Sequence, residues 1–267
     1  MELNISSKIY SKKYIIINDN NIEDIIVNIL NNCKCYLYIV FKNEKNVDTG
    51  INLNLQENSQ AKVFVINMMG EKVNNNLKIE NNLQENANLD FTIIDIGAKN
   101  SNTNYLTVLQ GDNSQNRLDA IYLGKENQVK EIDYAGELYG KNTNMNIYVE
   151  GALKDKSKKH FKGVIDFKRG SKKAVGNEEE YCTLLSDKAK SLSIPQLLCE
   201  EEDVVGNHAT AAGKIDKKQL FYLLSRGFDP KQAEKLLVRA KFNRILDKLK
   251  NGNCYEKINI MIDDILG

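Results

Sequence analysis

The sequence has no tryptophan, only two prolines and two histidines, and no excess of charge of either sign. Its 37 lysines and arginines balance 36 aspartates and glutamates, which leaves a net charge of +1. Because nucleic-acid-binding domains carry a marked basic excess, this balance argues against nucleic acid as a partner. The longest apolar runs, residues 14–17 and 36–41, are too short to span a bilayer, and we expect no signal peptide at the beginning.

Cysteine is scarce as well, with five residues in 267. An odd number without paired spacing is not typical of a disulfide framework, so we expect a reduced, cytoplasmic protein. A nucleotide-binding loop is also missing. Residues 136–142, GELYGKN, come nearest to a Walker A motif, but they have one residue too few between the glycines and lack the Ser or Thr. We therefore expect no ATP hydrolysis by this chain.

What the sequence does have is repetition. The run LQENSQAKV at 55–63 returns as LQENANLDF at 83–91, offset by 28 positions, and a weaker echo begins at Leu109. Short strands with polar corners at a fixed period are typical of a solenoid, in which each turn buries a face against the next at about 4.8 Å. We predict a mainly β protein with a right-handed parallel β-helix core. A β-sandwich is the alternative, since strand runs alone do not fix topology.

The repeat divides the chain into three parts: a small N-terminal module (1–45), the β-helix core (46–212) and a C-terminal helical domain (213–267). In the first part we expect α/β structure, with a helix over 22–30 capped by Asn21 and then a strand. In the last part we expect a helix from Asp216 to Arg226 stopped by Gly227, a second begun by Asp229-Pro230, and a short final helix. Leu220, Leu223 and Leu224 are expected in its core. Residues 168–173 and 178–180 are predicted to be solvated corners.

The most specific stretch covers residues 193–228. It contains, in order, the segments Pro195-Gln196-Leu197, Glu202-Asp203, His208-Ala209-Thr210, Gly213-Lys214-Ile215-Asp216 and LFYLLSRG at 220–227. This order resembles the C-terminal region of the SufB/SufD family, the scaffold proteins of the SUF iron–sulfur cluster assembly system. The resemblance implies the same β-helix core, and a protein that binds and assembles rather than an enzyme.

The resemblance also implies cluster ligands. Cys182, within YCTLL at 181–185, matches the place of the functional SufB cysteine, and His208 matches that of the functional SufD histidine. Thiolate and imidazole are the usual ligands of such clusters. The chain departs from SufB at Asn207 and Ala209, where SufB has glutamates. By residue type alone, a lone cysteine on a strand is usually a small core residue. For Cys199 we favour such a core position, with a second-ligand role as the minority interpretation.

The other cysteines and the second histidine carry less signal. Cys33 and Cys35 are separated by one residue, tighter than usual metal or redox spacing. Cys254 and His160 are expected at exposed positions.

The family resemblance implies partners too. Members bind SufC, an ABC-type ATPase, through the C-terminal helices, and the matching surface here comprises Phe221, Tyr222, Arg226, Gly227 and Pro230. A homodimer, or a heterodimer with a SufB/SufD-like chain, would bring Cys182 and His208 together at a protomer interface, where a transient cluster is built. Two alternatives remain open. One is a SufD-like subunit that docks SufC without holding a cluster. The other is a β-helix polysaccharide-active enzyme, for which a column of charged residues along one sheet is missing.

Overall fold

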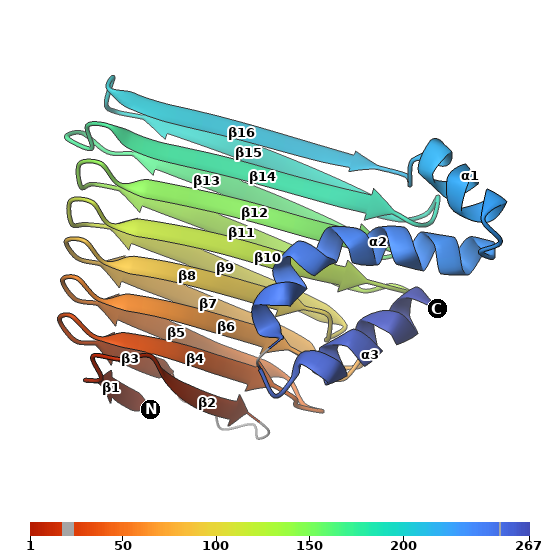
Figure 1. Cartoon of the computed structure of the whole chain (residues 1–267), viewed down its shortest axis with the longest axis horizontal. Coiled ribbons are helices and arrows are strands. Elements are labelled where there is room, and N and C mark those ends of the chain that lie inside the picture. The colour runs from red at the N-terminus through yellow and green to blue at the C-terminus, as the bar shows by residue number, and fades with distance from the viewer. Residues whose placement is uncertain (18–23, 251) are drawn as a thin grey trace.

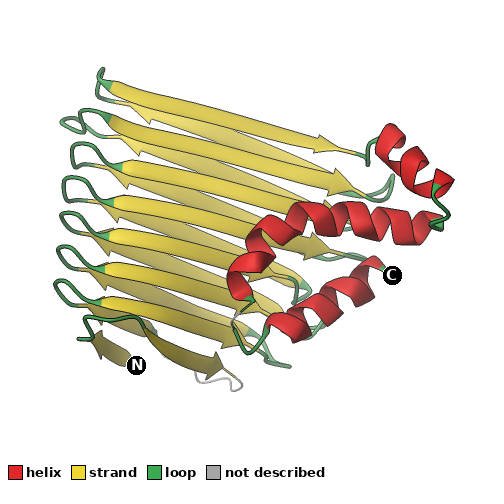
Figure 2. Ribbon diagram, viewed as in Figure 1, coloured by secondary structure: helices red, strands yellow, loops and turns green. Residues whose placement is uncertain are grey.

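A computed structural model describes residues 1–17, 24–250 and 252–267. These residues form a parallel β-solenoid of two sheets, followed by three α-helices and one short 3-10 helix. Figures 1 and 2 show the turns stacked in chain order, with the helices beside the solenoid. The odd-numbered sheet contains β1 (Glu2–Ile5), β3 (Ile25–Ile29), β5 (Val47–Leu55), β7 (Asn74–Leu83), β9 (Asn100–Leu109), β11 (Val129–Leu138), β13 (Lys158–Phe167) and β15 (Lys190–Cys199). The even-numbered sheet contains β2 (Ser11–Ile17), β4 (Lys34–Phe41), β6 (Gln60–Asn67), β8 (Asn88–Asp95), β10 (Gln115–Gly124), β12 (Asn144–Leu153), β14 (Ala174–Leu184) and β16 (Val204–Gly213).

Each strand pairs in parallel with the strand two further along the chain, which confirms a parallel β-helix and rules out the β-sandwich. The register reproduces the sequence echo, because Leu55 pairs with Leu83 and Val63 with Phe91. The turns explain the period. Asn58 and Asn86 occupy one corner in successive turns with φ of 57° and 54°, a left-handed conformation that asparagine tolerates better than most residues.

Asparagine side chains also link the turns to one another. The Asn54 amide donates to Asn28 at 2.9 Å, and the Asn28 amide donates to Asn4 at 2.9 Å. In-register side chains on a parallel sheet lie one strand spacing apart, which suits an amide that donates on one side and accepts on the other. The high asparagine content therefore has a structural role, in the corners and in these ladders.

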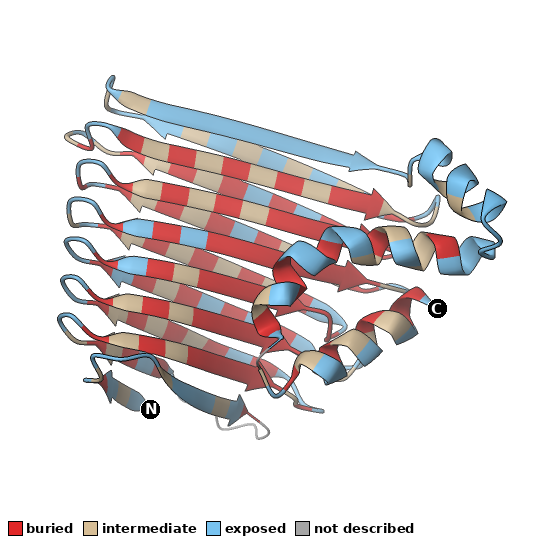
Figure 3. Ribbon diagram, viewed as in Figure 1, coloured by how far each residue is buried: buried red, intermediate tan, exposed pale blue. Residues whose placement is uncertain are grey.

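The interior between the two sheets is filled by alternate residues of every strand, most of them apolar. A second apolar cluster lies outside the even-numbered sheet, where α2 (Pro230–Leu246), the 3-10 helix η1 (Asp247–Leu249) and α3 (Tyr255–Leu266) cover it. Phe242 and Ile258, for example, are fully buried in the same cluster as Phe64. In contrast, α1 (Lys217–Ser225) has no buried residue, and Figure 3 shows it exposed along with β16. None of the helices in the described ranges is long and apolar enough to cross a membrane.

The helix ends follow the sequence prediction. Asp216 accepts hydrogen bonds from the amides of Lys218 and Gln219, and Gly227 has φ of +93°. Asp229 forms a reciprocal capping box with Gln232, and Pro230 is the first residue of α2. Such caps depend on residues within one turn of each other, which is why a sequence can predict them.

The predicted N-terminal helix is wrong. Residues 25–29 form β3, which pairs with β1 and β5, while Asn21 and Ile22 lie outside the described residues. Ile25, Val27 and Ile29 are buried with exposed or half-buried residues between them, so the strand period fits this run better than the helical one. The strands of the first 45 residues therefore belong to the same two sheets as the rest of the solenoid.

Candidate functional site

Cys182 lies on β14 with its side chain in the solenoid interior, 3% exposed. It is in register with Gly151 on β12 and Ala212 on β16, so it sits one strand below the end of its sheet. Burial raises the pKa of the thiol, and the Tyr122 hydroxyl and the Lys159 ammonium oppose that rise. The thiol is therefore protonated at neutral pH in the resting chain and has a cation beside it that favours the thiolate.

A hydrogen-bonded cluster of Lys159, Glu180, Tyr122 and Ser193 lies beside this thiol. The Lys159 ammonium is 2.9 Å from Glu180 Oε1, and neither side chain is exposed. The Tyr122 hydroxyl donates to Glu180 Oε1 at 2.7 Å, and the Ser193 hydroxyl donates to Glu180 Oε2 at 2.8 Å. Lys159 also donates to Ser193 Oγ at 2.8 Å. A buried ion pair with this many hydrogen bonds is well held, and loss of either charge would leave the other uncompensated.

Glu178, two residues earlier on β14, has a different environment. Its side chain is also fully buried, yet neither carboxylate oxygen has a hydrogen-bond partner among the described residues. Burial, together with the nearby Glu180 charge, raises the pKa of Glu178 to about 7. The carboxylate lies across the interior against Gly163, where a methyl group would overlap it.

The last turn, made of β15 and β16, is the open end of the solenoid: within the described ranges, each of these strands is paired on one edge only. His208 lies on β16, exposed and in register with Glu178, and so shares its inward face. Because Cys182 is in register with Ala212, Cys182 and His208 are four positions apart, roughly 13 Å along the strand. A single chain does not bring the two predicted ligands together. No group of three or more His, Cys, Asp or Glu side chains in the described part of the chain is arranged to hold a metal ion.

Several placements differ from the sequence expectation. Cys199 is exposed rather than in the core, because it ends β15 on the last turn and no further strand of the described ranges covers it. Cys254 is buried rather than exposed, since α3 brings it against the apolar cluster under the helices. His160 is exposed as expected, with Nδ1 2.9 Å from Glu131. Cys33 and Cys35 are both buried.

Sequence reasoning missed the groups around Cys182. Glu178 and Glu180 were predicted in a solvated corner, which is wrong: β14 begins at Ala174, so both glutamates lie on the same inward face as Cys182. The signal was the spacing of 178, 180 and 182, the period of one strand face. Lys159 and Tyr122 gave no comparable signal, because they meet Glu180 only when three different strands stack.

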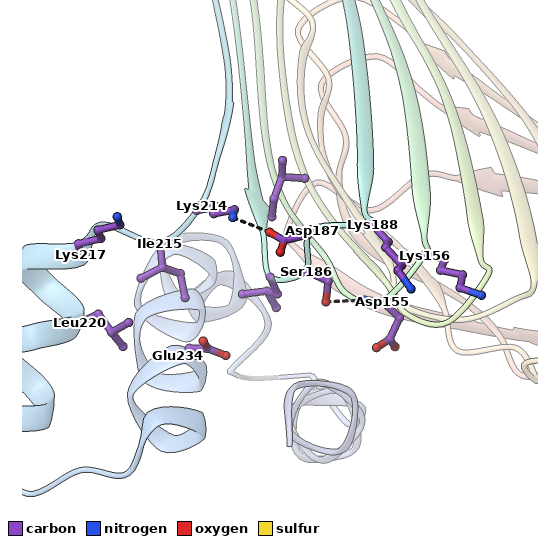
Figure 4. A pocket seen from close by; sticks show the side chains of 12 residues that line it. Asp155, Lys156, Ser186, Asp187, Lys188, Lys214, Ile215, Lys217, Leu220 and Glu234 are labelled. Atoms are coloured by element: carbon purple, nitrogen blue, oxygen red, sulfur yellow. Dashed lines mark hydrogen bonds and ion pairs between the residues drawn. The ribbon is translucent and has the colours of Figure 1, made fainter.

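The C-terminal surface is apolar where the sequence predicted a partner site. Phe221 is 72% exposed and Tyr222 56%, and the Arg226 guanidinium lies 5.2 Å from the centre of the Tyr222 ring. Leu220 and Leu223 are half-buried and Leu224 is exposed, so the predicted core position of these leucines is wrong. A cavity of about 660 Å³ separates α1 from the turn after β14. Figure 4 shows its lining, including the ion pair between Lys214 and Asp187 at 2.5 Å.

Comparison with known proteins decides the family. The family model for the SufBD core domain of the SUF iron–sulfur cluster assembly system matches residues 12–241. The chain belongs to the SufBD family.

Individual SufBD relatives match over shorter stretches. The iron–sulfur cluster assembly protein SufD of Bacillus subtilis is 30% identical over 143 residues, 54% of this chain and 33% of the relative. An iron–sulfur cluster assembly SufBD family protein of Pyrococcus horikoshii is 28% identical over 190 residues, 69% of this chain and 41% of the relative. A Mycobacterium bovis member is 40% identical over 81 residues, 30% of this chain and 20% of the relative. The chain thus spans less than half the length of these relatives.

Proposed function

We propose that this chain is a scaffold on which a nascent iron–sulfur cluster is assembled, at an interface between two protomers and with a SufC-type ATPase bound to its helices. Its own part is binding rather than turnover. The observation that carries the proposal is the environment of Cys182: a buried thiol next to a lysine and a tyrosine, one strand below an open end that presents His208.

The separation of the two ligands favours an interface. Cys182 and His208 lie about four positions apart on neighbouring strands, so one chain cannot place both on one cluster. The free edges of β15 and β16 leave backbone groups that a second protomer can pair with. Two copies meeting at their open ends would bring a cysteine and a histidine from each chain to one region, which suits a cluster that needs several ligands.

Because Cys182 is buried, the ATPase would be needed to expose its thiol. While β16 covers the thiol, iron cannot reach it, and the thiolate is disfavoured by burial. Movement of the last turn, driven through the helices that follow β16 directly, would uncover the thiol. Phe221 and Tyr222 on α1, with Arg226 beside them, supply the exposed aromatic and arginine side chains that anchor protein interfaces. Gly227 and Pro230, which set the turn into α2, complete this surface.

Anaerobic purification after co-expression with a SufC-type ATPase tests the proposal. We expect the ATPase to co-purify and the complex to contain iron and acid-labile sulfide. The alternative function, a SufD-like subunit that docks SufC without holding a cluster, predicts co-purification with neither iron nor sulfide. It draws support from the similarity to the Bacillus subtilis SufD. Cys199, exposed at the end of β15, stays a minority ligand candidate in either case.

A further inference from the structure

The open end of the solenoid holds one buried group that neither the fold nor the proposed cluster ligands account for. Glu178 is fully buried, and both of its carboxylate oxygens lack a hydrogen-bond partner among the described residues. Buried charges are normally paired, hydrogen-bonded or coordinated to a metal, because desolvation without compensation costs several kcal/mol. A buried carboxyl group with no partner among the described residues therefore has oxygen atoms available to a ligand.

Glu180, on the same strand, can be compared with Glu178. Glu180, two residues away and equally buried, is satisfied by Lys159, Tyr122 and Ser193. The fold thus supplies partners for a buried carboxylate in this region, and does not supply them to Glu178. The space for Glu178 is also built in, since any side chain larger than hydrogen at Gly163 would overlap the carboxylate.

His208, on the neighbouring strand, is a second potential metal ligand close in register to this carboxylate. It is in register with Glu178 on the adjacent strand, so the two residues belong to the same inward face and their Cα atoms are one strand spacing apart. Nothing in the described ranges stacks on β16, and His208 is exposed. The end of the interior thus presents an imidazole to solvent, and the strand beneath it carries a buried carboxylate that lies against Gly163 and has no hydrogen-bond partner among the described residues. Imidazole and carboxylate together are a typical ligand set for Fe(II), with coordination positions left for water or for a facing protomer.

We propose that Glu178 and His208 form an entry site for ferrous iron at the open end of the solenoid, with Glu178 as a ligand from the strand beneath. This inference rests on the proposed scaffold function. It adds the place at which the chain would bind iron, one of the two components of the cluster.

The test is anaerobic titration of the whole chain with Fe(II) alone, in competition with a chromogenic chelator. Glu178→Gln keeps the shape of the side chain and removes its charge. Glu179→Gln is the matched control, because Glu179 faces outward on the same strand and accepts from the Tyr181 hydroxyl. We expect Glu178→Gln and His208→Ala each to weaken Fe(II) binding roughly tenfold or more, and Glu179→Gln to leave it unchanged. Thermal unfolding of each variant checks that it is folded.

The outcomes separate this inference from the proposed function. Fe(II) affinity of Glu178→Gln within about twofold of the unaltered chain would overturn the inference, as would an unaltered chain that binds no Fe(II). If Glu178→Gln binds iron normally while Cys182→Ser loses cluster content, the scaffold function stands without this site. If Glu178→Gln and His208→Ala lose Fe(II) binding while Cys182→Ser keeps full cluster content, the iron site stands and Cys182 is not a cluster ligand.

Discussion

Glu178 and Glu180 are identical side chains on one strand that have different surroundings. Both are fully buried on the inward face of β14, but only Glu180 has a lysine and two hydroxyl donors. Glu180 and Lys159 hold the interior around Cys182 in one arrangement. Glu178 has no hydrogen-bond partner among the described residues, so burial of its charged form near the open end lowers stability to a degree that depends on pH.

That cost predicts a pH dependence. The folded-state pKa of Glu178 is about 7, above the ordinary 4.5, so the folded chain holds this proton more tightly than the unfolded chain. Protonation of Glu178 therefore contributes to the free energy of unfolding. This contribution is fully present below about pH 4.5 and is lost as the pH rises to about 7, which lowers the free energy of unfolding by about 3 kcal/mol at most. We expect Glu178→Gln to remove this loss, so that its thermal midpoint exceeds that of the unaltered chain at pH 8 by more than at pH 5. Equal differences at the two pH values, or a gain in Glu179→Gln as well, would contradict this explanation.

Substitution of Lys159 should lower stability, whereas substitution of Glu178 should raise it. Lys159→Met removes the cation from a buried carboxylate and leaves Glu180 with two hydroxyl donors only. We expect a loss of about 3–5 kcal/mol in unfolding free energy, measured by denaturant titration. Lys162→Met, an exposed position on the same strand, serves as the control and should change stability by less than about 0.5 kcal/mol. A loss in Lys159→Met no larger than in the control would mean that the ion pair contributes nothing to holding the interior.

At the scale of elements, the helices divide into two kinds. α2 and α3 cover the outer face of the even-numbered sheet and bury Phe242, Ile245 and Ile258 there. α1 buries no residue, carries Phe221 and Tyr222 in solvent, and borders a cavity. Deletion of all three helices would therefore uncover an apolar sheet face and would not isolate the contribution of α1.

Point variants separate the two kinds of helix. We expect Phe221→Ala with Tyr222→Ala to leave the thermal midpoint unchanged and to reduce capture of a co-expressed SufC-type ATPase at least tenfold. Phe242→Ala should instead lower the unfolding free energy by about 3–5 kcal/mol, because it empties a packed site. The assignment of α1 as the docking helix is wrong if the α1 double variant captures the ATPase as well as the unaltered chain does.

The elements were predictable from sequence to different degrees. The solenoid followed from the echo of 55–63 at 83–91, because each turn repeats one corner and one strand register. The helix caps at Asp216 and Asp229 followed from local residues. The β3 strand did not, since its apolar residues fit two periods and only pairing with β1 and β5 decides between them. The partners of Glu180 did not either, since Tyr122 is 58 positions away and meets it only after folding.

At the scale of the whole molecule, the solenoid is a stack whose interior changes along its length. The first turns are filled by apolar residues such as Leu37, Ile39 and Phe41, whereas the last turns enclose Lys159, Glu180 and Cys182. The stack then stops at β15 and β16 without a covering element among the described residues. The middle turns also enclose a buried ion pair, Lys130 with Asp95, but only in the last turns does a polar interior lie next to strand edges that are unpaired among the described residues. This end of the chain therefore suits a function that needs a second protomer.

The central claim is that Cys182 and His208 are cluster ligands, and cluster loading of their variants tests it most directly. Iron and acid-labile sulfide are measured after anaerobic reconstitution of the unaltered chain, of the Cys182→Ser, His208→Ala double variant, and of Cys254→Ala. Cys254 is the matched control, a buried cysteine in the separate cluster under the helices. The account predicts cluster in the unaltered chain and in Cys254→Ala and a large loss of both iron and sulfide in the folded double variant. Full iron and sulfide loading of the double variant would contradict it.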